Sequence, residues 1–272
     1  MYEKFLSKHV QTIKPSGIRK YFDLASEMEG VISLGVGEPD FDTPENIRNA
    51  CKKALDEGKT RYINVPGIAE LRRAICRKLK KDNHVEYAPE QICVSTGAKQ
   101  ALNNAVMAVV NPGDEVIIPM PGWVSYVEIV KLVGGVPVCV DTDENFQLDL
   151  AAIEKAVTPR TAAVLINTPN NPTGAVYSRE SMEALAELAV RNDFYIISDD
   201  VYEKLIYNGR VHECVASFSD AAYEHSIIIN GMSKAFAMTG WRCGYKAATA
   251  AVAAGIRANQ GHSTANRCTQ LQ

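Results

Sequence analysis

The chain has 272 residues, of which 46% are hydrophobic and 22% are charged, and its formal net charge is -3. This length can bury one large core, and the scattered, nearly balanced charge argues against nucleic acid or an anionic membrane as a partner. Because the chain has no run of eighteen apolar residues and no apolar leader, we expect a cytoplasmic protein without membrane contact.

Short runs of β-branched residues alternate with longer segments of helical period, which is typical of βαβ units and a mainly parallel sheet. Most of these runs are apolar on both faces, as a sheet covered by helices on both sides requires. We therefore predict an α/β fold with three layers, α/β/α. The expected strands are residues 91–95, 115–119, 136–140, 163–167, 194–198 and 226–230.

The expected helices between these strands have recognisable ends. Thr43 is expected to cap, and Pro44 to open, a helix that runs to about Gly58, where glycine suits the C-terminal cap. A second helix is expected over residues 67–81, and Ser178 is expected to cap a third. Their apolar faces consist of Ile68, Leu71, Ile75 and Leu79 in the second helix and of Met182, Leu185 and Leu188 in the third.

Cysteine and histidine give no sign of a metal site. The seven cysteines are odd in number and widely spaced, so we expect reduced, mostly buried thiols. The histidines show no ligand spacing, and we expect surface or loop positions without a catalytic role for His84, His212, His225 and His262.

Lys234 follows the apolar run that ends at Ile229, close to the end of an expected strand. Burial lowers the pKa of an amine and makes it a nucleophile that can form a Schiff base with an aldehyde. Eight residues later, Arg242 offers a permanent cation whose fork suits a phosphate. Together they describe a site for pyridoxal 5'-phosphate; the alternative is a Lys/Arg pair on a solvated loop.

Asp199 follows the strand that ends at Ile197. In open α/β sheets ligands bind outside the carboxyl ends of the strands, so this carboxylate lies where a ligand is expected. The carboxylate can pair with the protonated pyridine nitrogen of pyridoxal phosphate and so keep the ring of this cofactor an electron sink. Tyr202 can reach the phenolic oxygen of the same ring. The alternative is that Asp199 caps a following helix.

Two further segments end strands with small or turn-forming residues. Around Gly97 a strand leads into a helix, where free N–H groups form an anion site and glycine lets a phosphate approach closely. The run from Asn167 to Gly174 has a composition that makes a turn in any protein.

In combination these segments resemble the class I and II aminotransferases, the fold-type I pyridoxal phosphate enzymes, and especially their prokaryotic aspartate aminotransferase branch. The resemblance covers about Ser16 to Gly244. It includes Asn171-Pro172-Thr173-Gly174, the segment from Ser233 to Arg242, and an N-terminal signature over residues 35–44.

The resemblance implies a role for each matched residue. Lys234, Asp199 and Tyr202 are implied to be catalytic, and Gly37, Trp123, Asn171 and Lys99 to contact substrate. Tyr62 matches a tyrosine that reaches the phosphate in the neighbouring subunit, which implies a homodimer with shared sites. The cofactor contacts implied are Gly97, Ala98, Lys99, Trp123, Asn171, Asp199, Tyr202, Ser233, Lys234, Arg242 and Tyr62.

The implied reaction moves an amino group between an amino acid and a 2-oxo acid, with Lys234 shifting a proton from the α-carbon of the substrate. The lysine matching Lys99 can face a second carboxylate, so aspartate with 2-oxoglutarate is the expected pair. Aromatic and N-acyl-diaminopimelate substrates stay open. A β-lyase or decarboxylase of the same fold is the enzymatic alternative, and a cofactor-binding regulatory module is the non-enzymatic one.

We expect residues 1–42 to be an N-terminal segment belonging to a small domain and substrate lid, and residues 43–272 to be the cofactor-binding large domain, ending abruptly. Family members continue into a small domain that supplies an arginine for the α-carboxylate, and Arg257 and Arg267 come too early to match it. The family usually has a small apolar residue where Lys246 stands. We therefore expect a fragment that binds cofactor but transaminates poorly or not at all.

Overall fold

The computed structural model describes residues 5–11, 13, 17, 24, 27–32, 37–264 and 268–272. Several positions considered above lie outside the described residues. They are Ser16, where the resemblance begins, Gly35 and Val36 of the N-terminal signature, and Arg267.

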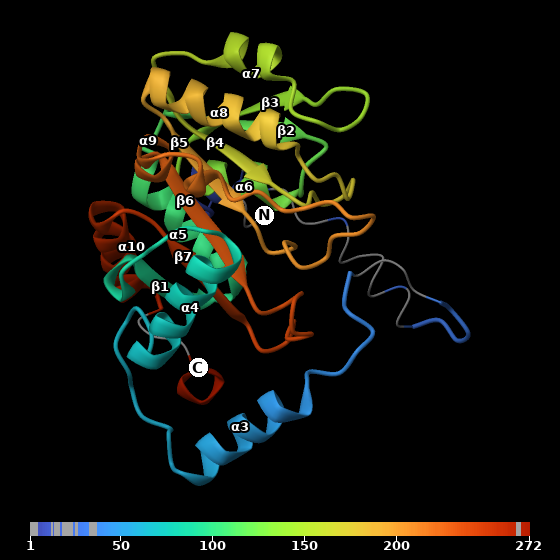
Figure 1. Ribbon diagram of the computed structural model, residues 1–272, viewed down its shortest axis with the longest axis vertical. Helices are drawn as coiled ribbons and strands as arrows, with labels where there is room; N and C mark the ends of the chain where they lie inside the picture. The colour runs from blue at the N-terminus through green and yellow to red at the C-terminus, as the bar shows by residue number, and fades with distance from the viewer. Residues whose placement is uncertain are drawn as a thin grey trace.

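A seven-stranded sheet forms the centre of the described part of the chain (Figure 1). The strand order is β1-β7-β6-β5-β4-β2-β3, and each pairing is parallel except those of β7 with β1 and β6. The strands are β1 (Ile92–Thr96), β2 (Glu115–Met120), β3 (Val136–Asp141), β4 (Thr161–Asn167), β5 (Tyr195–Asp199), β6 (Ser226–Gly231) and β7 (Cys243–Ala247).

The mainly parallel sheet predicted from the sequence is confirmed, and the six expected strands lie within two residues of their expected bounds. The seventh strand, β7, was not expected. Its residues include Gly244 and Lys246, which are poor strand formers, and its strand structure depends on pairing with neighbours on both sides.

Helices cover both faces of the sheet, so the three-layer prediction is also confirmed. Alternate residues of β6 show why: Ile227 and Ile229 enter one apolar core, and Ile228 enters the other. One face carries α5 (Gly97–Val109), α6 (Ser125–Leu132) and α10 (Ala250–Ser263). The other carries α4 (Ala69–Asp82), α7 (Leu150–Ala156), α8 (Arg179–Asn192) and α9 (Asp220–Glu224).

The helix ends agree with the sequence in one case and differ in another. Ser178 caps α8 as predicted, since its hydroxyl accepts the backbone N–H of Ser181 at 3.2 Å. The prediction that Thr43 caps α3 (Glu45–Asp56) is wrong, because Pro44 takes the N-cap position. The hydroxyl of Thr43 instead donates to the carbonyl of Ala237 at 2.5 Å, which ties the start of α3 to the segment that carries Lys234.

Helix α3 lies apart from the layered body and touches the short helix η4 (Thr269–Leu271) near the C-terminus (Figure 1). The remaining short helices are α1 (Lys8–Gln11), η2 (Pro89–Gln91) and η3 (Val215–Ser217). The division of the chain at residue 42 stays a prediction. Among the described helices, none has both the length and the apolar character needed to cross a bilayer.

Candidate active site

The predicted site residues gather at the carboxyl edge of the sheet. Strands β1, β4, β5 and β6 run in the same direction and end at this edge. In the sheet register Asn167 pairs with Asp199, and Asp199 pairs with Ile229, so the ends of three neighbouring strands are level. The topology of the sheet therefore brings together segments that are far apart in the sequence, as expected for an open α/β fold.

Lys234 lies in a turn that follows β6, with its amine directed toward other predicted site residues. Its Nζ donates a hydrogen bond to the carbonyl of Gly37 and lies 5.8 Å from the centre of the Tyr202 ring. Burial lowers the pKa of the Lys234 amine below its ordinary value; Arg242 adds to this, and the charge of Glu38 opposes it. The amine is thus shifted toward its nucleophilic form.

Asp199 ends β5 and is 5% exposed. The hydroxyl of Tyr126 donates to its Oδ2 at 2.9 Å, and the backbone N–H of Val201 donates to its Oδ1 at 3.3 Å. Burial raises the pKa of Asp199 to about 7, although both hydrogen bonds lower it. The residues directly after Asp199 form a turn, and the next described helix begins at Val215, so the alternative of a helix cap is wrong.

Asn171 and Tyr202 are joined by a chain of hydrogen bonds that leads back to β5. The amide of Asn171 donates to the hydroxyl of Tyr202 at 3.2 Å, and its backbone N–H donates to Asn167 Oδ1 at 2.7 Å. Asn167 in turn donates through Nδ2 to the carbonyl of Asp199 at 2.7 Å. Asn167 was not singled out in the sequence, yet it fixes the turn that carries Asn171 against the strand that carries Asp199.

The turn from β1 into α5 is shaped by two close approaches. Gly97 has φ +80°, and a side chain there would overlap the guanidinium of Arg242. A side chain at Gly244 on β7 would overlap the backbone of Ala98. Arg242 itself donates to the carbonyl of Thr239 at 2.9 Å. The first N–H groups of α5 and one guanidinium therefore face the same small space.

Trp123 and Lys99 lie next to each other. The Lys99 Nζ is 4.7 Å from the centre of a Trp123 ring, and the Trp123 ring meets Tyr126 edge-on with centroids 5.3 Å apart. Because Tyr126 also binds Asp199, the aromatic pair connects the turn after β2 to the buried carboxylate. Tyr126 was missed in the sequence, although it lies three residues after Trp123 on the first turn of α6.

Tyr62 stands apart from the residues just described. It is 94% exposed and lies in the segment before α4, and none of the hydrogen bonds in the described residues involves its hydroxyl. Ser233 is buried, and its backbone carbonyl accepts the N–H of Met238 at 3.1 Å. The structure thus gathers the other predicted site residues but leaves Tyr62 on the surface.

His212 lies in a loop, as one of the two expected positions, but it is not at the surface. Its side chain is 7% exposed, and its Nε2 lies 3.2 Å from Oδ2 of Asp200, which is fully buried. The two groups are not aligned for a hydrogen bond, and within the described residues neither atom has a hydrogen-bond partner. Burial lowers the pKa of His212, but the carboxylate of Asp200 outweighs this and raises it above its usual value. A histidine and a carboxylate that form a charged pair when the imidazole is protonated thus lie directly beside Asp199.

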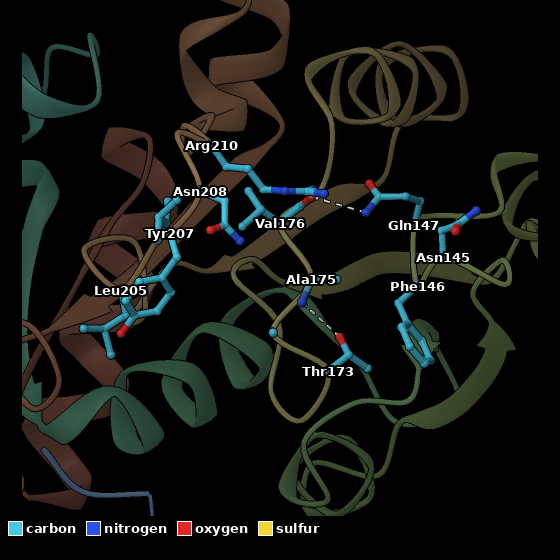
Figure 2. Close-up of a pocket in the computed structure, with 12 residues that line it drawn as sticks. Asn145, Phe146, Gln147, Thr173, Ala175, Val176, Leu205, Tyr207, Asn208 and Arg210 are labelled. Atoms are coloured by element: carbon cyan, nitrogen blue, oxygen red, sulfur yellow. Dashed lines mark hydrogen bonds between the residues drawn. The ribbon is translucent and has the colours of Figure 1, made fainter.

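Figure 2 shows a separate pocket of about 290 Å³ beside the turn that follows Asn171. Its walls come from residues 145–147, 173–176, 205–208 and 210. Gln147 and Arg210 both donate to the carbonyl of Val176, at 3.2 and 3.4 Å. These bonds hold Val176, which follows the turn that carries Asn171, to the segments of Gln147 and Arg210.

Comparison with known proteins gives one consistent family. The family model of class I and II aminotransferases matches residues 29–272. The chain is 43% identical to an aspartate aminotransferase of Bacillus sp. (strain YM-2), and the match covers 99% of the chain and 70% of that relative. It is 45% identical to an aspartate/prephenate aminotransferase of Cereibacter sphaeroides, with 98% and 69% covered. The solved structure of Thermus thermophilus aspartate aminotransferase with maleate superposes with a TM-score of 0.94 at 45% identity, covering 98% of this chain and 70% of that one.

Proposed function

This chain belongs to the class I and II aminotransferases, and on that premise we propose that it uses pyridoxal 5'-phosphate to move an amino group from aspartate to 2-oxoglutarate. Enzymes of this family depend on pyridoxal phosphate in general. One observation carries the proposal: an amine with a lowered pKa, Lys234, and a buried carboxylate, Asp199, meet at the same edge of the sheet.

The residues around Gly97 suit the phosphate of this cofactor. The positive end of α5 and its free N–H groups favour an anion, and the lack of a side chain at Gly97 leaves room for the guanidinium of Arg242 against the turn. Arg242 lies against the same turn with a fork that matches phosphate oxygens. Gly97, Ala98, Lys99 and Arg242 would hold the phosphate.

Asp199 suits the nitrogen of the cofactor ring. When bound, the cofactor supplies an aldehyde for an amine and a ring that withdraws electrons from the substrate. Within the part of the chain that the structure describes, the buried carboxylate of Asp199 accepts two neutral hydrogen bonds, from Tyr126 and Val201, and has no cationic partner. A protonated ring nitrogen would be that partner, and Asp199 would hold its proton in place. Tyr126 orients the carboxylate, and Trp123 would cover the face of the ring.

Lys234 has two tasks in the proposed reaction. Its amine would hold the aldehyde of the cofactor in the resting enzyme, and, once free, it would take the proton from the α-carbon of the amino acid as general base. Burial lowers the pKa of this amine, which favours both tasks near neutral pH. Tyr202 and Asn171, 3.2 Å apart, would bind the phenolic oxygen of the ring and so fix the cofactor relative to Lys234.

The substrate proposal rests on Lys99 and on the named relatives. The amine of Lys99 over Trp123 is suited to the second carboxylate of a dicarboxylic acid, and Gly37, whose carbonyl accepts from Lys234, would contact the α-carboxylate. Aspartate is named in both relatives described above, and prephenate in one of them, so an aromatic or cyclic substrate is the second candidate.

We also propose that the chain forms a homodimer and works in the cytoplasm. The exposed Tyr62 supports the dimer, because a tyrosine that is 94% exposed is available to a second copy. Its proposed role is to reach the phosphate held by the partner.

An absorbance titration tests the proposal. The purified chain is mixed with pyridoxal phosphate, and aspartate is added while the release of 2-oxo acid is measured. We expect a visible band that depends on Lys234, is absent in Lys234→Ala, and changes on addition of aspartate. Lys99→Ala should weaken the binding of aspartate as substrate but leave the binding of alanine unaffected. No Lys234-dependent band overturns the cofactor assignment, while release of pyruvate or carbon dioxide without an acceptor favours a lyase or decarboxylase.

A further inference from the structure

Lys246 on β7 is buried between the sheet and the helices α5 and α10, with 1% of its surface exposed. Its Nζ donates to Ser95 Oγ at 2.6 Å and to Gln260 Oε1 at 3.0 Å. No ion pair within the described residues includes Lys246. Burial lowers the pKa of this amine to about 8, so at neutral pH it remains a cation without a carboxylate partner.

The titratable and charged groups near Lys246 give it no compensating negative charge at neutral pH. Cys93 lies opposite Lys246 in the register of β1 and β7. Burial raises the pKa of the Cys93 thiol, so the thiol stays neutral. The other charges that act on Cys93 are those of Arg257 on α10 and Arg72 on α4, and both are positive.

The hydrogen-bond network around Lys246 is complete without it. The hydroxyl of Ser95 and the amide of Asn104 both donate to Gln260 Oε1, at 2.6 and 3.1 Å. Gln260 donates in turn to the carbonyls of Val65 and Val94, at 3.0 and 2.7 Å. If an apolar side chain replaced Lys246, each of these groups would keep a partner. The buried charge is therefore not required to satisfy its surroundings.

The position of the Lys246 amine relative to the turn at Gly97 suggests a role other than completing this hydrogen-bond network. Ser95, which Lys246 contacts, lies two residues before Gly97 on β1. Gly244, two residues before Lys246 on the same face of β7, packs against Ala98. The cation thus lies behind the turn that faces Arg242. With a strand rise of about 3.3 Å per residue, it is on the order of 10 Å from an anion held at Gly97.

We propose that Lys246 is a supporting cation of the phosphate turn, which strengthens the binding of a phosphate-bearing ligand without touching it. The proposal rests on the function proposed above, since it takes the phosphate of pyridoxal phosphate as the ligand. At ~10 Å and an effective dielectric constant of about 20, one added positive charge increases the affinity for a phosphate roughly tenfold. Lys246 is in this sense a positioning residue and takes no part in the chemistry.

The test compares ligands that differ only in the phosphate. Dissociation constants of pyridoxal phosphate, pyridoxal and inorganic phosphate are measured at pH 7 and pH 9.5 for wild type and Lys246→Met. Lys155→Met, which removes an exposed lysine from α7, is the matched control for net charge. We expect Lys246→Met to reduce the preference for pyridoxal phosphate over pyridoxal roughly tenfold at pH 7. In wild type, the preference for pyridoxal phosphate over pyridoxal should fall by the same factor between pH 7 and pH 9.5. In Lys246→Met, this preference should be the same at both pH values.

Other outcomes separate this inference from the proposed function. Equal weakening of pyridoxal phosphate and pyridoxal in Lys246→Met indicates a structural role and overturns the inference. An affinity for inorganic phosphate that is the same in wild type and in Lys246→Met also overturns the inference. If wild type binds neither pyridoxal phosphate nor pyridoxal through Lys234, the proposed function is overturned and this inference with it.

Discussion

Replacing Lys246 by methionine is expected to stabilise the folded chain at neutral pH, although it removes two hydrogen bonds. Burial lowers the pKa of this amine from 10.5 to about 8, which means that the folded state binds the proton more weakly than the unfolded chain. Because a tenfold change in proton affinity is worth about 1.4 kcal/mol, the buried charge costs about 3 kcal/mol at pH 7. Methionine fills a similar volume, and Ser95 and Gln260 keep their mutual hydrogen bond.

The gain in stability depends on pH with a definite sign. Below pH 8 the amine is protonated in both the folded and the unfolded state, so the full cost of burial is present. Between pH 8 and pH 10.5 the unfolded chain keeps a proton that the folded chain has released, and the stability of wild type rises with pH. The advantage of Lys246→Met should therefore narrow by about 2 kcal/mol between pH 7 and pH 9.5.

Urea unfolding followed by circular dichroism, without added ligand, measures this difference. The midpoint should move to higher urea in Lys246→Met with an unchanged slope, since the surface exposed on unfolding stays the same. Lys155→Met should leave the free energy of unfolding within about 0.5 kcal/mol of the wild-type value. A variant less stable than wild type at pH 7, or an advantage of equal size at both pH values, would refute the reasoning.

Three further substitutions probe the rest of the site. Gly97→Ala forces a side chain into φ +80° and against the guanidinium behind it, so inorganic phosphate affinity should fall at least about tenfold by calorimetry; unchanged affinity contradicts the phosphate turn. Asp199→Asn should reduce turnover roughly 100- to 1000-fold in a coupled assay while the melting temperature does not fall, because burial of the ionised carboxylate is unfavourable; full activity excludes the ring-nitrogen role. His212→Asn should cost about 3 kcal/mol below pH 6.5, where the imidazolium offsets the buried Asp200. The raised pKa of His212 means that this stabilisation is lost as pH rises through that pKa, so the difference in urea midpoints should shrink at higher pH; a constant difference excludes the charged pair.

Strands with continuous apolar character could be predicted from the sequence, and the strand that depends on its neighbours could not. Residues 226–230 are rich in isoleucine and enter cores on both faces, so local pattern and final position agree. Strand β7 has glycine and lysine in its centre, and its conformation comes from the ladders that β1 and β6 offer. The side chain of Thr43 was assigned to a local cap but is used by a residue far along the chain, a contact that no local pattern indicates.

Some residues of the candidate site could likewise be predicted from the sequence, and others could not. Lys234, Asp199 and Asn171 each follow an apolar strand, and parallel strands ending at one edge make their meeting predictable. Tyr126 was not singled out, and His212 was given no role, because their importance comes from what they contact: the carboxylates of Asp199, at the end of β5, and of Asp200, directly after it. A charged residue such as Lys246 is expected at the surface, and its burial is explained by the packing of α5 over β7 and of α10 over α5 and β1.

The placement of β7 has a consequence for how the chain folds during synthesis. Strand β1 is made early, but its neighbour in the sheet is β7, about 150 residues later. Until β7 leaves the ribosome, β1 and β6 each present an unpaired edge, and the turn at Gly97 has no strand beside it. At a synthesis rate of about 5–20 residues per second this interval lasts on the order of ten seconds or more. During that time β1 has no partner from the described sheet and is open to chaperones and to other chains, whereas β6, made only about 12 residues before β7, waits a second or two. Strand β7 then pairs with both.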